Sequence, residues 1–184
     1  VVDWGDTSPP ETITTYNGFS HVYDDIGEHT ISITGVFPNI NISGSASAPK
    51  LKRVTNLGTV GWTKLLYGFN GCSNLTEFTA GTTDVSAVTT MERLFEGCTA
   101  LTSVDITTFA TTSALKSVSR MFRSCSSLTS LTFPAAFDTS GVNNMYYTFD
   151  GCSGLTSIVG VEDWDITGLN STNDLTNFLT VGSM

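Results

Sequence analysis

The sequence feature that most constrains the fold is an internal repeat marked by four cysteines. They follow one another at intervals of 26, 27 and 27 residues, and each closes a segment such as Phe95-Glu96-Gly97-Cys98. Apolar residues keep the same register in every copy, as the leucine three residues after each cysteine shows. A fixed period of this length is typical of arrays whose units bury their apolar faces against one another. The sequence therefore predicts a solenoid of about four units, with the cysteines at Cys72, Cys98, Cys125 and Cys152.

Within one unit, two hydrophobic periods follow each other. Residues 101–106 alternate between apolar and polar, which favours a half-buried strand. Upstream, helical spacing relates the apolar residues Val88, Met91, Leu94 and Phe95. Asp84 or Ser86 is placed to cap such a helix. Each unit is thus expected to be a short strand, a turn and a short helix, with the strands of successive units pairing in parallel.

These residues resemble a known family. The pattern V-x-x-M-x-x-x-F-x-x-C-x-x-L-T-x-L is similar to the BspA-type leucine-rich repeat, a surface-protein repeat of mycoplasma and Bacteroidetes lipoproteins. The resemblance covers about residues 50–180 and implies an α/β repeat solenoid with leucine-rich-repeat-like parallel strands and short helices on the convex side. It also implies unpaired cysteines. Thr111 departs from the aspartate of the pattern, and the unit after Leu169 is degenerate. We therefore expect one array domain over residues 50–184.

The first 49 residues differ from the array, because they contain no lysine or arginine but both histidines. Asp3-Trp4-Gly5-Asp6, His21-Val22-Tyr23 and residues 27–33 resemble the second half of a PKD-type, immunoglobulin-like β-sandwich. We expect residues 1–49 to be a partial domain of this kind, or a small all-β N-terminal cap on the first repeat, since bare strand edges invite aggregation. Residues 44–49 are expected to be a flexible joint.

Charge and composition narrow the function. The net charge is −9, from 8 basic and 17 acidic residues, which disfavours nucleic acid and anionic membrane surfaces as partners. An apolar run long enough to span a bilayer is absent from the sequence, so no direct membrane insertion is expected. No phosphate-binding loop, dinucleotide-binding or nucleophile-elbow motif occurs, and we expect neither enzymatic activity nor a cofactor.

The cysteines and histidines each allow a chemical and a structural interpretation. Cysteines 26–27 residues apart do not match a zinc site, and neither histidine lies in the repeats to activate a thiol. Equivalent placement in every unit favours a structural ladder of buried thiols, although oxidation between adjacent rungs stays open. His21 and His29, with Asp24 and Asp25 between them, would suit a metal, and Asp3 and Asp6 would add ligands for calcium. Such residues are more often ordinary surface and turn positions, and no metal site is assigned.

Small hydroxyl side chains recur on the predicted strands, at positions that flank the buried leucines. One interpretation is a recognition surface that uses these hydroxyls together with two carboxylates. The other is that β-branched threonine simply suits a parallel strand, and a threonine array of the ice-binding type is a third. The candidate contact residues are Thr76, Glu77, Thr102, Ser103, Asp105, Thr129, Ser130, Thr156 and Ser157.

The resemblance implies a non-enzymatic binding or adhesion module, extracellular or at the cell surface, that recognises a protein or a glycan through the strand face. The aromatic residues Trp62, Tyr146, Tyr147 and Trp164 are expected to be exposed and to anchor a partner. The alternative is a structural or receptor-binding segment of a phage virion fibre or extracellular filament, with homo-oligomers as its mark. The start of the chain, Val1-Val2-Asp3-Trp4, suggests a piece of a longer protein.

Overall fold

A computed structural model describes residues 1–14, 20–169 and 177–178, and the chain divides into two compact units, Val1–Phe37 and Pro38–Met184. The boundary thus lies before residue 38 rather than after residue 49. The reason is hydrogen bonding, since the carbonyl of Pro38 accepts from the amide of Thr63 at 2.9 Å and the amide of Ile42 donates to Gly68 at 3.3 Å. Residues 38–49 therefore belong with the array.

The first unit is held together by a short antiparallel pair of strands and by a row of stacked aromatic side chains. Strands β1 (Val2–Asp3) and β2 (Ser32–Ile33) pair antiparallel. Trp4 stacks on His21 with ring centroids 4.8 Å apart, and Tyr23 stacks on His29 at 3.9 Å. The Tyr23 hydroxyl also donates to the carbonyl of Trp4 at 3.0 Å. Four of the residues on which the PKD-type resemblance rests thus pack together in this unit, while its role as a cap stays a prediction.

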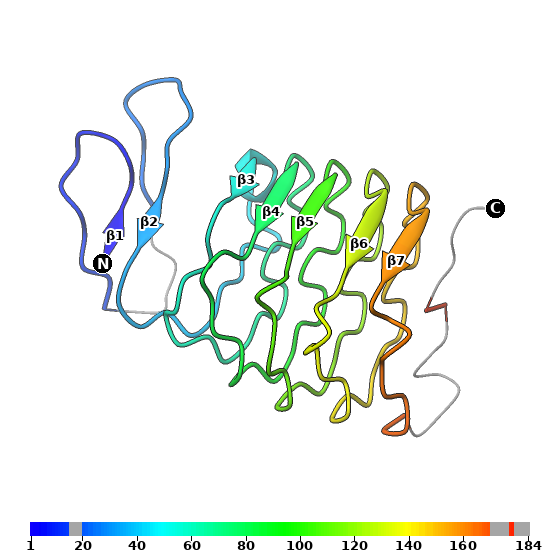
Figure 1. Cartoon of the computed structure of the whole chain (residues 1–184). Coiled ribbons are helices and arrows are strands. Elements are labelled where there is room, and N and C mark those ends of the chain that lie inside the picture. The colour runs from blue at the N-terminus through cyan, green and yellow to red at the C-terminus, as the bar shows by residue number, and fades with distance from the viewer. Residues whose placement is uncertain (15–19, 170–176, 179–184) are drawn as a thin grey trace. The chain divides into compact units, whose positions relative to one another are not determined.

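The second unit is a parallel repeat fold, with one short strand from each repeat standing in a row (Figure 1). The strands are β3 (Arg53–Val54), β4 (Glu77–Thr79), β5 (Ser103–Asp105), β6 (Ser130–Thr132) and β7 (Ser157–Val159). Strands β3, β4 and β5 form one sheet, and β6 and β7 form a second. Equivalent residues face each other, as Phe78 faces Val104 and Leu131 faces Ile158. The predicted repeat and its parallel strands are confirmed.

The predicted helices are wrong. In the described residues there is no α-helix, and the helical element is a 3₁₀ turn, η1 (Ala48–Lys50), which overlaps the end of the stretch expected to be a flexible joint. Where helices were expected, every second backbone amide donates to a carbonyl of the next repeat, as Phe69 does to Leu94 at 2.8 Å. The amides between them donate to carbonyls of their own repeat. Each such segment also contains a left-handed residue, such as Arg93 with φ of 55°. An α-helix needs φ near −63° throughout, so this residue ends it.

Phenylalanine side chains fill the core of the array. One ring from each repeat stacks on the ring of the next repeat. The ring centroids are 5.8 Å apart for Phe69 and Phe95, 5.2 Å for Phe95 and Phe122, and 5.9 Å for Phe122 and Phe149. Phe78, from β4, packs edge-on against Phe95 at 4.7 Å, and both rings are fully buried. Each buried ring contributes about 1.5–3 kcal/mol. The strands and the turn segments thus meet across the core, and their outward side chains point away from each other.

Candidate functional site

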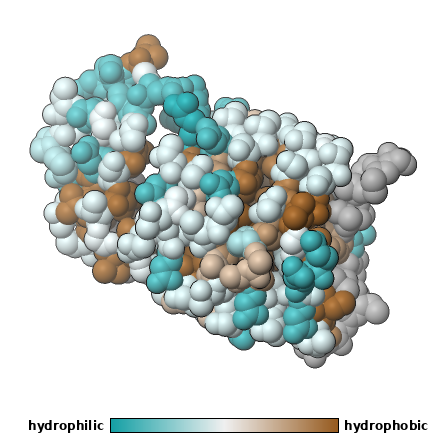
Figure 2. Space-filling model, viewed as in Figure 1, coloured by the Kyte–Doolittle hydropathy of each residue, from teal (hydrophilic) through white to brown (hydrophobic). Residues whose placement is uncertain are grey.

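All nine predicted contact residues of the strand face are exposed. They lie on or directly before β4, β5, β6 and β7, where the alternating residues Phe78 and Leu131 point inward and are buried. Over this row of strands the surface in Figure 2 is mainly pale, the colour of residues of intermediate hydropathy such as serine and threonine. The structure therefore brings the predicted residues to one surface, namely Thr76, Glu77, Thr102, Ser103, Asp105, Thr129, Ser130, Thr156 and Ser157.

The threonine hydroxyls on this surface bond to the neighbouring repeat. Thr102 Oγ1 donates to the carbonyl of Thr76 at 3.1 Å, and Thr156 Oγ1 donates to the carbonyl of Thr129 at the same distance. Thr76 Oγ1 does the same toward Lys52 at 3.2 Å. These threonines help to hold the stack, and each hydroxyl keeps a lone pair that can accept a hydrogen bond from a ligand.

The row of strands is interrupted between β5 and β6, where a groove of about 290 Å³ opens. In the described residues no strand pairing joins β5 to β6, whereas β4 pairs with β5 and β6 with β7. Four of the nine predicted contact residues lie in the lining of this groove. The full lining is Thr102, Ser103, Val104, Asp105, Thr107, Ser130, Leu131 and Thr132.

Asp105 is the charged residue of the groove lining. Its carboxylate accepts hydrogen bonds from the Thr107 hydroxyl at 2.7 Å and from the Thr107 amide at 3.0 Å. These bonds lower the pKa of Asp105 below its ordinary value of 3.8, because they stabilise the charged form. At neutral pH the groove therefore offers serine and threonine hydroxyls beside one fixed carboxylate, a set that can bind polar ligand groups and contains no nucleophile paired with a base.

Two of the four aromatic residues expected to be exposed anchors are buried. Trp62 is 3% exposed, and its indole donates to the carbonyl of Gly58 at 3.2 Å. Trp164 is 9% exposed and packs against Phe133 with centroids 4.8 Å apart. The expectation was wrong for these two because Trp62 is buried with its indole bonded to main-chain carbonyls, and Trp164 packs into the phenylalanine core. Tyr146 and Tyr147 are half-buried and lie on the turn segment rather than on the strand face.

The four cysteines are free and buried. Each thiol after the first donates to a phenylalanine carbonyl of the preceding repeat, as Cys98 does to Phe69 at 3.2 Å and Cys125 to Phe95 at 3.2 Å. Burial raises the pKa of Cys72 to about 12 and the pKa of Cys125 well above 9.0. A thiol whose pKa is raised in this way is a poor nucleophile and metal ligand. The pKa of Cys152 is instead lowered by a hydrogen bond with the Cys125 thiol, but its side chain is fully buried like the others. The geometry thus supports a packing role for Cys72, Cys98, Cys125 and Cys152.

The histidines lie close to carboxylates within the first unit. His21 Nε2 lies 2.6 Å from Asp6, and His29 Nε2 lies 3.0 Å from Asp25. Hydrogen bonds from Ser8 and His21 hold the pKa of Asp6 well below its usual range. Within the described ranges, no three His, Cys, Asp or Glu side chains gather closely enough to hold a metal ion.

Sequence reasoning missed a row of arginine and tyrosine side chains on the turn segments. Tyr67, Arg93, Arg120 and Tyr147 occupy one register, at intervals of 26, 27 and 27 residues, and all have φ of 55–56°. The same register that identified the cysteine ladder could have found them. The sequence places them in the predicted helices, where charged residues are ordinarily solvated.

The family described as "Mycoplasma protein of unknown function, DUF285" matches residues 41–164, more than half of the chain. The chain belongs to this family. No curated protein gives a significant match. For this DUF285 protein, the described residues contain no helix with the length and hydropathy that crossing a bilayer requires.

Two solved structures are similar to this DUF285 protein. A leucine-rich repeat protein from Bacteroides ovatus ATCC 8483 is 22% identical, with a TM-score of 0.32, and the match covers 84% of this chain and 40% of that one. The T. pallidum leucine rich repeat protein is 18% identical, with a TM-score of 0.25, and the match covers 60% and 63%. This chain thus spans less than two thirds of either protein.

Proposed function

We propose that this DUF285 protein is a non-enzymatic binding module, extracellular or at the cell surface, that recognises a protein or a glycan through its strand face. The observation that carries the proposal is the groove between β5 and β6, because it gathers Thr102, Ser103, Asp105 and Ser130 from two repeats around one hollow. A concave site with a few convergent polar groups is the usual setting for ligand recognition.

Binding at this groove would rest on shape and hydrogen bonds. Ser103 and Ser130 supply hydroxyls that both donate and accept, and the Asp105 carboxylate accepts from ligand hydroxyl or amide groups. The frame is rigid because every flanking repeat is bonded to its neighbour through the backbone. A preorganised surface loses little conformational entropy on binding, which favours affinity without a covalent step.

A binding screen against immobilised glycans and cell-surface proteins tests this proposal. Ser103→Lys and Ser130→Lys each place a long cationic chain in the groove, and we expect about a tenfold or greater loss of affinity. Ala87→Lys is the matched control, because Ala87 is also exposed but lies in the turn after β4. Binding that survives both groove substitutions, or the absence of any binder, would contradict the proposal.

A further inference from the structure

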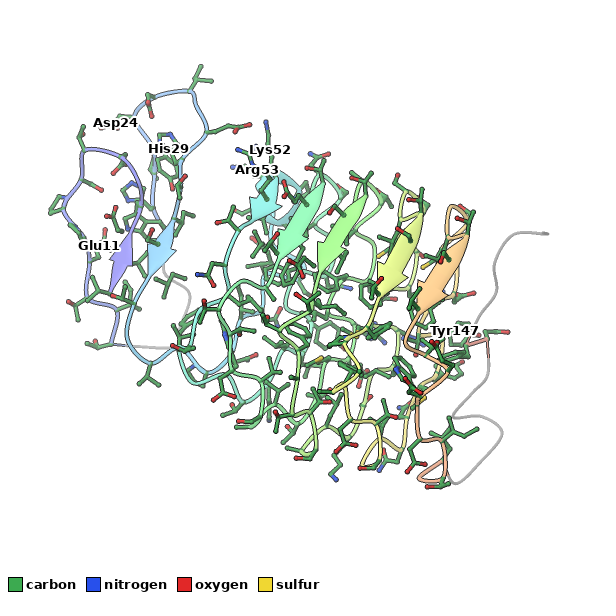
Figure 3. The ribbon with its side chains drawn as sticks, viewed as in Figure 1. Glu11, Asp24, His29, Lys52, Arg53 and Tyr147 are labelled. Atoms are coloured by element: carbon green, nitrogen blue, oxygen red, sulfur yellow. The ribbon has the colours of Figure 1, made fainter. Side chains whose placement is uncertain are left out.

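A second surface lies on the turn segments and contains the row Tyr67, Arg93, Arg120 and Tyr147, here called the arginine–tyrosine row. Guanidinium groups stack on rings along it, at 5.2 Å from Arg93 to Tyr67 and 5.7 Å from Arg120 to Tyr147. Figure 3 labels Tyr147, at the end of the row nearer the C-terminus. These side chains are held in place by their stacking and by the fixed left-handed backbone, so they form a preorganised surface.

Two arginines of this surface already have carboxylate partners. Arg93 lies 3.3 Å from Glu96 and 3.6 Å from Glu92. Arg123 bridges two repeats, with one nitrogen 3.0 Å from Glu96 and another 3.0 Å from Asp150. Their charges are therefore neutralised within the array.

Arg120 is different. No carboxylate of the described residues lies within ion-pair distance of it. Its Nε, like that of Arg93, is buried without a hydrogen-bond partner, and its guanidinium hydrogen-bonds to the Tyr146 side chain. The sequence explains the difference, because the positions that hold Glu92 and Glu96 beside Arg93 hold Ser119 and Arg123 one repeat later. The guanidinium instead lies over Tyr146 and Tyr147, with its central carbon 5.4 Å and 5.7 Å from their ring centroids.

We propose that Arg120, flanked by Tyr146 and Tyr147, binds a carboxylate from an acidic segment of a protein partner. A guanidinium can hold a carboxylate through two parallel hydrogen bonds, and partial desolvation by the tyrosines strengthens that attraction. Arginine and tyrosine are also the residues most enriched where protein interfaces concentrate their binding energy. The site goes beyond the strand-face function, since it lies across the core from the groove.

A protein carboxylate fits this site better than a sugar acid does. Sugar recognition commonly uses an open aromatic face, but Tyr147 is stacked by Arg120 at 5.7 Å and by Arg123 at 5.3 Å, and Tyr146 packs on its edge at 3.9 Å. The protein carries a net charge of −9, so an acidic partner gains nothing from long-range attraction. Binding must therefore arise from the local arginine geometry.

The test titrates the full chain with the peptide acetyl-Gly-Glu-Gly-Glu-Gly-amide and, in parallel, with its glutamine counterpart. Arginine Nε–H signals are followed by nitrogen-15 NMR. We expect the glutamate peptide to shift the Arg120 signal more than those of Arg93 and Arg123, and the glutamine peptide to leave it in place. Arg120→Gln should weaken binding about tenfold. Arg93→Gln is the matched control, because that guanidinium is already paired, and it should bind like the wild type.

Three results would overturn the proposal. They are an Arg120 signal that does not respond to the glutamate peptide, an Arg120→Gln variant that binds like the wild type, and 3′-sialyllactose shifting the Arg120 signal where the peptide does not. If Arg120→Gln fails to fold, the wild-type titration with the two peptides decides alone. Ser103→Lys should bind the peptide normally, so failure of this site and failure of the groove are distinguishable.

Discussion

At the scale of single residues, the cysteine positions are set by packing. Each thiol sits beside the phenylalanine row and is fully buried, and Cys98, Cys125 and Cys152 each donate to a main-chain carbonyl of the repeat before. A small apolar side chain with a weak donor satisfies both demands, since a larger residue would strike the neighbouring repeat. The recurrence of cysteine at this position is therefore explained by the close packing of successive repeats rather than by any thiol chemistry.

This burial predicts unreactive thiols in the native protein. We expect 5,5′-dithiobis(2-nitrobenzoic acid) to label no cysteine at pH 8 in buffer and to label all four in 6 M guanidinium chloride, which exposes them. Absorbance of the released thiolate measures both. Rapid labelling of the native protein would contradict the burial of the ladder, and labelling below four after unfolding would indicate disulfides.

The sequence alone predicts which residues recur with the repeat and which of them are polar. The exposure of Ser103 and Ser130 follows from strand alternation, which depends on local sequence alone. The burial of Trp62 and Trp164 does not, because it depends on contacts with residues of other segments, such as the packing of Trp164 on Phe133. The lack of a carboxylate partner for Arg120 among the described residues could not be predicted either, since it depends on which charged residues the adjacent repeats place beside it.

At the scale of elements, the main departure from expectation is the replacement of helices by turns. The apolar spacing of Val88, Met91 and Leu94 fits a helix, but it also fits a segment that turns at Arg93 and donates alternate amides to the next repeat. Both solutions bury the same side chains. The array prefers the second because it adds a ladder of hydrogen bonds between repeats, a partner that a local sequence pattern does not include.

The missing strand pairing between β5 and β6 also belongs to the scale of elements. It predicts that backbone amides along the row of strands exchange their hydrogens at different rates. The Thr102 and Thr156 amides donate to the preceding repeat at 3.0 Å and 2.9 Å, whereas no backbone bond in the described structure joins the equivalent Thr129 to β5. We expect the Thr129 amide to exchange at least tenfold faster than those of Thr102 and Thr156, measured by NMR in deuterated buffer. Equal protection at the three positions would mean that β5 and β6 pair in solution and that the groove is closed.

At the scale of the whole molecule, the same turn closes repeat after repeat. The carboxylates of Asp84, Asp138 and Asp165 share one register, and each accepts the amide of the residue two positions later, at 2.8–2.9 Å. At Asp84 the sequence predicts a helix cap, whereas the structure has a turn. In each case the hydrogen bonds lower the aspartate pKa below 3.8, so all three turns favour the ionised form.

These three turns predict acid sensitivity with a defined sign. A carboxylate whose pKa is lower in the folded than in the unfolded chain stabilises the fold at pH values above about 3.8, and that stability is lost as the pH falls further. We expect the urea midpoint of unfolding to hold steady from pH 7 to about 5 and to drop below about 4. The triple variant Asp84→Asn, Asp138→Asn and Asp165→Asn keeps an acceptor in each turn without a titrating group, so its midpoint should fall less steeply between pH 4 and pH 3. If the variant and the wild type lose stability in parallel, the turns do not carry the acid response.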